Sequence, residues 1–72
     1  MTRQEFGRRF KAALAYADIR NYELAYKLGV TKMQISYYCT GQNVPRTARL
    51  KRISEITGVP FDFFTGVTNK IQ

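Results

Sequence analysis

Glycine and proline divide this chain into segments too short for long helices or large strands. The dividing residues are Gly29, Gly41, Pro45, Gly58, Pro60 and Gly66. Each segment between them has about the length of a short helix. No segment alternates apolar and polar residues with period two, which argues against strands. The pattern therefore predicts a set of short helices joined by tight turns.

The length of the chain limits what these helices can build. Its 72 residues amount to one small domain, and 44% of them are apolar. That share is enough for a core, although a domain of this size buries only about 60% of its extended-chain surface. We expect a compact all-α domain over residues 1–66, with a short, frayed tail over residues 67–72.

The first segment carries an apolar stripe at helical spacing, made of Phe6, Phe10, Ala13, Leu14 and Ala17. Thr2, with Glu5 three residues later, predicts a capping box at the start of this helix. Gly7 lies inside it and costs up to about 1 kcal/mol relative to Ala. A basic amphipathic helix can also bind a membrane surface or calmodulin, but the two Phe favour a core helix.

Four further helices are expected, over residues 21–28, 31–39, 46–57 and 60–65. The turn residues after three of them are glycines, and Thr31 with Gln34 predicts a second capping box. The expected inward residues are Leu24, Ala25, Leu28, Leu50, Ile53, Ile56 and at least two of Phe61, Phe63 and Phe64.

Residues 21–40 carry the spacing of a helix-turn-helix. Ala25 permits a close crossing of two helices, Gly29 makes the turn four residues later, and Ile35 anchors the second helix. The other apolar positions of the pattern are Leu24, Leu28, Val30 and Tyr38. A lone A-x-x-x-G is weak evidence, whereas all seven positions in a basic chain of short helices are a strong signal.

On these residues the chain resembles the Cro/CI-type (XRE-like) helix-turn-helix regulators of bacteria and temperate phages. The matching segments are E-L-A (23–25), L-G-V-T (28–31), I-S (35–36), G-Q-N-V-P (41–45), L-K-R-I (50–53) and G-V-P (58–60). The resemblance implies a five-helix, lambda-repressor-like domain whose recognition helix spans 31–39, and a small phage switch protein. The chain departs from the family at Asn21, commonly Gln, at Arg20, commonly Thr, and at Cys39, often Glu.

A rotation of about 100° per residue from an inward Ile35 places the other side chains of the recognition helix. It predicts Thr31, Tyr38 and Cys39 on the buried side, Met33, Tyr37 and Thr40 facing outward, and Gln34 and Ser36 at the flanks. In a major groove, Lys32 would donate to guanine, Gln34 would pair with adenine, and Met33 and Tyr37 would touch thymine methyl groups. Thr31 and the first amides would hold a phosphate, and Asn21, Gln42, Asn43 and Arg46 would hold neighbouring phosphates.

The same face also suits a protein partner. It holds one charge and no Arg for the bidentate guanine contact, whereas Met and Tyr are enriched in protein interfaces. Tyr22 and Tyr26 would widen this apolar surface. Two partners therefore stay open: operator DNA, bound as a homodimer on two half-sites, and the phage CI-type repressor, bound by an anti-repressor or modulator of repression.

Charge and composition narrow the function classes further. Twelve Lys and Arg against five Asp and Glu give a net charge of +7, which favours a polyanionic partner. Without His, and with its five carboxylates scattered, the chain is not expected to be an enzyme, to hold a metal or cofactor, or to take a small-molecule substrate. Cys39 has no disulfide partner and is expected to be a small buried hydrophobe. No apolar run is long enough for a membrane, and we expect the bacterial host cytoplasm.

Overall fold

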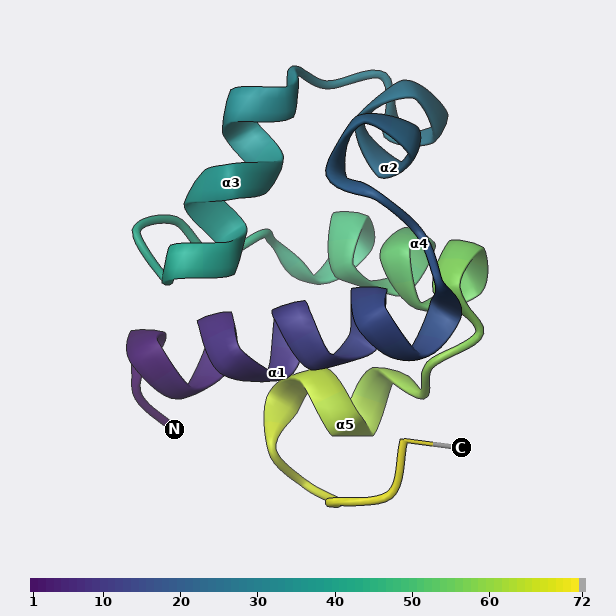
Figure 1. Cartoon of the computed structure of the whole chain (residues 1–72). Helices are drawn as coiled ribbons and strands as arrows, with labels where there is room; N and C mark the ends of the chain where they lie inside the picture. Colours follow the sequence, from purple (N-terminus) through teal and green to yellow (C-terminus); the bar gives the residue numbers. More distant parts are fainter. Residues whose placement is uncertain (72) are drawn as a thin grey trace.

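A computed structural model describes residues 1–71, which form five α-helices joined by short turns (Figure 1). The helices are α1 (Arg3–Ala17), α2 (Asn21–Leu28), α3 (Lys32–Thr40), α4 (Thr47–Thr57) and α5 (Phe61–Thr65). The all-α prediction is confirmed, and the observed bounds of the last four helices lie within one residue of the expected ones.

The first residues of the helices were predictable from the sequence because local hydrogen bonds cap them. The backbone N–H of Glu5 donates to Thr2 Oγ1 at 3.1 Å, and that of Gln34 donates to Thr31 Oγ1 at 3.1 Å. The start of α2 lacks a Ser or Thr cap, but the carboxylate of Glu23 accepts from the backbone N–H of Arg20 at 2.9 Å. The unusual Arg20 therefore does not weaken the helix start as much as a missing cap would.

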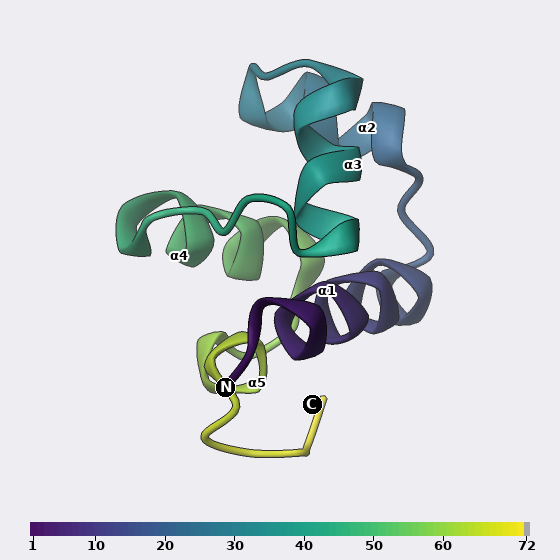
Figure 2. The ribbon, with the colours of Figure 1, turned by 90° about the vertical axis from the view of Figure 1, so that its left-hand side faces the viewer.

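The core is centred on α1, which lies between α3 on one side and α5 on the other, with α4 packed behind (Figures 1 and 2). Phe10 is fully buried, and its ring centroid lies 5.8 Å from Phe6, 5.6 Å from Tyr38 and 6.1 Å from Phe64. These separations are typical of packed aromatic pairs. The predicted apolar stripe of the first helix is thus the centre of the core.

α1 crosses α3 at very short range. A Cβ placed on Gly7 would lie 2.6 Å from the carbonyl oxygen of Cys39 and 2.9 Å from the backbone nitrogen of Gly41. Such distances are too short for any side chain atom against backbone. The close packing of α1 on α3 therefore requires Gly7. The free energy gained by this packing offsets the cost of a glycine inside the helix.

The tail is anchored where fraying was expected. Arg9 Nη1 donates to the carbonyl oxygens of Phe63 and Thr68, both at 2.9 Å, and Arg9 Nη2 donates to Asn69 Oδ1 at 2.7 Å. Ile71 is half-buried against the core. The fraying prediction is therefore wrong for these residues, while Gln72 lies outside the described residues and the division at residue 66 stays a prediction.

Candidate functional site

The two helices of the candidate site, α2 and α3, are held together as the spacing predicted (Figure 2). Ala25 is buried at their crossing, and Gly29 ends α2 in the left-handed conformation, with φ of 74°. The backbone N–H groups of Gly29 and Val30 both donate to the carbonyl oxygen of Ala25, at 2.9 and 3.0 Å. Ile35 is fully buried below this turn.

The first turn of α3 is the most accessible part of the recognition helix. Lys32 is exposed, Met33 is 62% exposed, and Gln34 is half-buried. Thr31, expected on the buried side, is exposed instead. The reason is that Thr31 is the N-cap, with extended backbone angles of −80° and 156°, so the helical rotation does not apply to it.

The last turn of α3 is less open than the rotation predicted. Tyr38 and Cys39 are buried and Thr40 is exposed, as expected, and Ser36 is half-buried. Tyr37, expected to face outward, is also only half-exposed. The chain after Gly41 turns back against this turn, where the backbone N–H of Asn43 donates to the carbonyl oxygen of Tyr37 at 3.2 Å.

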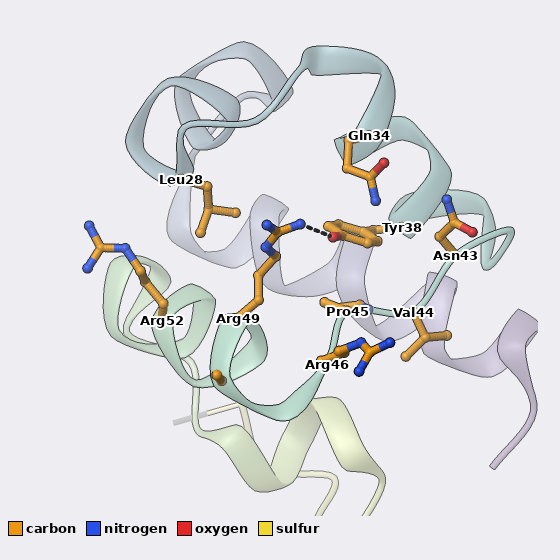
Figure 3. Close-up of a pocket in the computed structure, with 10 residues that line it drawn as sticks. Leu28, Gln34, Tyr38, Asn43, Val44, Pro45, Arg46, Arg49 and Arg52 are labelled. Atoms are coloured by element: carbon orange, nitrogen blue, oxygen red, sulfur yellow. Dashed lines mark hydrogen bonds between the residues drawn. The ribbon is translucent and has the colours of Figure 1, made fainter.

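Three of the candidate residues meet in one open pocket of about 680 Å³ between α3 and the start of α4 (Figure 3). They are Gln34, Asn43 and Arg46. Asn21, in contrast, is half-buried at the first residue of α2 and does not line this pocket. The structure therefore groups the recognition helix with the loop after it, and leaves the start of α2 apart.

Arg49 and Arg52 also line the pocket. From the sequence, the basic residues of 46–52 were expected either to form a solvated helix face or to place Arg46 and Arg49 against a phosphate backbone or an acidic partner, and Arg52 was given no such role. Arg49 Nη1 donates to the hydroxyl oxygen of the buried Tyr38 at 3.1 Å, across the pocket floor (Figure 3). Their spacing of three residues, continued from Arg46, was a readable signal, because residues three apart share one face of a helix.

An apolar surface lies on the outer sides of α2 and α3. Tyr22 is 59% exposed and Tyr26 is 88% exposed, in addition to Met33. Their expected exposure is confirmed. Side chains this open do not contribute to the core, and exposed apolar residues that gather on one surface are typical of interaction sites.

The cysteine is part of the core. Cys39 is 9% exposed, and burial raises the pKa of its thiol, an effect that the charge of Lys11 partly offsets. Both the burial and the raised pKa disfavour the reactive thiolate form. The prediction of a small buried hydrophobe is confirmed.

Residues 1–71 contain neither a metal-binding cluster nor a membrane-spanning helix. No group of three or more His, Cys, Asp or Glu side chains lies close enough to hold a metal ion. None of the helices in this part of the chain is both long and apolar enough to cross a membrane.

Comparison with known proteins agrees with this geometry. A family model described as helix-turn-helix matches residues 12–64, which is most of the chain and includes all of α2, α3 and α4. Neither the search of curated proteins nor that of solved structures finds a match.

Proposed function

Because the chain belongs to the Cro/CI-type helix-turn-helix family of DNA-binding transcription regulators, a non-enzymatic family, we propose that it controls a temperate-phage genetic switch by binding operator DNA through α3. The observation that carries the proposal is the open first turn of α3. Lys32 and Met33 are exposed there, and the capped helix start leaves its first amides available to a phosphate.

The residues around that turn make two kinds of DNA contact, with base edges and with phosphates. Lys32 and Gln34 reach base edges, and Met33 touches a thymine methyl group. Asn43 and Arg46, in the loop that follows α3, hold phosphates and fix the register. Ser36 and Tyr37, half-buried in the structure, contribute less than Lys32, and Asn21 holds a phosphate at the start of α2. Binding as a homodimer on two half-sites would double these contacts.

A gel shift on the DNA directly upstream of the gene tests this proposal. We expect salt-dependent binding by the protein alone, and Lys32→Ala should weaken it about tenfold or more, because a base contact is lost. Lys51→Ala is the matched control, since Lys51 is an exposed lysine of α4 that does not line the pocket. Equal losses of DNA affinity in both variants would show that Lys32 contributes only its charge, and would contradict base reading by α3.

A second candidate function is binding to the phage CI-type repressor, as an anti-repressor or modulator of repression. The exposure of Tyr22, Tyr26 and Met33 supports it, because aromatic and Met side chains are typical anchors of protein interfaces. The recognition surface would then cover the repressor instead of, or together with, DNA.

The same gel shift, repeated with the co-encoded repressor, separates the two candidates. A regulator acting through its own operator shifts DNA alone. An anti-repressor instead releases the repressor from its operator, and Met33→Ala together with Tyr26→Ala should abolish that release. Val67→Ala is the control, because Val67 is 74% exposed in the tail, away from α2 and α3. Release that survives the double substitution would contradict the second candidate.

A further inference from the structure

The pocket between α3 and α4, called here the α3–α4 groove, has a cationic wall. Arg46, the N-cap of α4, and Arg49 and Arg52 within α4 line it at a spacing of three residues (Figure 3). Among the described residues that line the groove, none is acidic. The start of α4 lies at the same place, so the positive end of its dipole adds to the three guanidinium charges.

The rest of the groove combines the polar side chains of Gln34 and Asn43 with an apolar part. Leu28, Val44, Pro45 and Ala48 line it, and Val44 is 46% exposed. The hydroxyl of the buried Tyr38 lies among them and accepts its hydrogen bond from Arg49. An apolar surface beside three cations favours a ligand that has apolar and anionic groups together.

Duplex DNA matches only part of this combination, because Gln34, Asn43 and Arg46 suit its bases and phosphates whereas the apolar side chains find no counterpart there. Its backbone offers phosphates and sugars, and phosphate contacts need charged groups or amides rather than an apolar hollow. An amphipathic helix with acidic residues fits better, because its apolar side chains enter the hollow while its carboxylates meet the guanidinium groups in bidentate pairs.

We propose that the α3–α4 groove binds an acidic amphipathic helix of a protein partner. From the N-cap Arg46 to Arg52 the chain advances about 9 Å along the axis of α4, at roughly 1.5 Å per residue. Carboxylates at positions i, i+3 or i+4, and i+7 of the partner helix match that length. A second copy of this chain does not, because its five acidic residues are distributed over different segments.

Because Gln34, Asn43 and Arg46 belong both to the groove and to the proposed DNA contacts, a bound acidic helix excludes DNA. This exclusion rests on the proposed DNA-binding function, whereas binding in the groove does not. The groove is therefore a place at which an acidic partner controls access to the recognition helix.

The test uses the full chain and a synthetic helix-forming peptide of about 18 residues, long enough to be partly helical alone. It carries Leu at i and i+4 with Glu at the flanking positions, and a second peptide carries Gln in place of Glu. Chemical-shift mapping should place the Glu peptide at Leu28, Val44, Ala48 and Arg52, and the Gln peptide should bind about tenfold more weakly.

Two charge reversals on α4 provide the matched variants. Arg52→Glu and Lys51→Glu change the net charge equally, and both residues are exposed, but Lys51 does not line the groove. Arg52→Glu should lower peptide affinity about tenfold, and Lys51→Glu should change it less than about twofold. Circular dichroism of both variants shows whether the fold is kept.

Equal losses in the two variants, or shifts spread over all basic residues, would overturn the proposal. So would an absence of peptide binding while an operator duplex shifts the groove residues, because the groove would then belong to the DNA contacts. If the peptide binds but no duplex does, groove binding stands and the proposed DNA function fails. Competition between peptide and duplex supports both.

Discussion

Gly7 determines how closely α1 can approach the recognition helix. Helix propensity favours Ala over Gly by about 1 kcal/mol in a helix interior. Here that preference is outweighed, because the space that a Cβ would need is occupied by the backbone of Cys39 and Gly41. Backbone atoms cannot rotate away as a flexible side chain can, so one helix has to move.

Gly7→Ala should therefore destabilise the protein, although propensity alone predicts the opposite. Overpacking costs about 1–3 kcal/mol, which exceeds the propensity gain at the upper part of that range. The expected net loss of about 1 kcal/mol lowers Tm by about 4–8 °C in a domain of this size. Thermal unfolding followed by circular dichroism measures it.

Ala12→Gly calibrates this result, because Ala12 is exposed on the same helix and reports the cost of glycine without a close contact. A higher Tm for Gly7→Ala than for the unchanged chain would contradict the tight crossing.

Single residues also show where sequence reasoning stops. Thr2 and Thr31 were identified as caps because capping depends on neighbours three residues away. Thr31 was predicted to be buried and is exposed, because an N-cap residue does not follow the helical rotation. Tyr37 was predicted to face outward and is only half-exposed, because the loop after Gly41 folds back on α3. The second error needs knowledge of a backbone hydrogen bond from Asn43 that no side-chain pattern encodes.

Among the elements, α1 has a second role besides its apolar stripe, because Arg9 links it to α5 and the tail. The side chain of Arg9 is 14% exposed, pairs with Glu5 at 3.2 Å, and has its guanidinium 5.0 Å from the centre of the Phe63 ring. It also satisfies carbonyl oxygens of Phe63 and Thr68. Arg9 therefore holds the last described residues against α1 and α5.

Arg9→Gln should loosen this end of the molecule. Losing charge-assisted hydrogen bonds and leaving carbonyl oxygens without a donor costs about 2 kcal/mol. Amide hydrogen exchange should accelerate most at Val67 and Thr68, whose N–H groups donate to the carbonyl oxygen of Asp62.

Arg8→Gln removes the same charge from an exposed neighbour in α1 and should leave both stability and exchange nearly unchanged. Equal stability and equal amide exchange in the two variants would contradict the anchoring of the tail by Arg9. The sequence could not show that Arg9 has partners 54 or more positions away.

For the whole molecule, the net charge of +7 is informative only once its distribution is known. Seven of the twelve basic residues lie in α1 and α4, Arg46 is the N-cap of α4, and Lys32 is the basic residue of α3. The fold places Arg46 beside the recognition helix and the tail with Lys70 on the far side of α1 (Figure 1). Charge on the two sides should therefore affect DNA binding differently.

Arg46→Ala should reduce the slope of log affinity against log salt by about 1, because one phosphate contact is lost. Lys70→Ala makes the same change in net charge and should leave the slope unaltered. Affinities measured by fluorescence anisotropy over a salt series give both slopes. Equal slopes for the two variants would show that DNA binding does not depend on which side carries the charge.

The fold was more predictable than the site for a physical reason. Helix bounds depend on caps, glycines and spacing, which are local, and the helix-turn-helix depends on positions within residues 21–40. The α3–α4 groove combines Leu28 of α2, Tyr38 of α3 and Arg52 of α4, so it exists only after three elements have packed. No local pattern specifies its shape.

The packing of α1 on α3 and α5 also sets the order in which the domain can fold while the chain is being synthesised. α1 is made first, but its apolar stripe packs on Tyr38 of α3 and on Phe64 of α5. Until those residues have left the ribosome, the stripe has no native partner, and a helix of this length is marginal alone. The domain therefore completes its folding only when α5 has emerged, and a nascent chain that stalls before Phe64 keeps Phe10 within reach of chaperones.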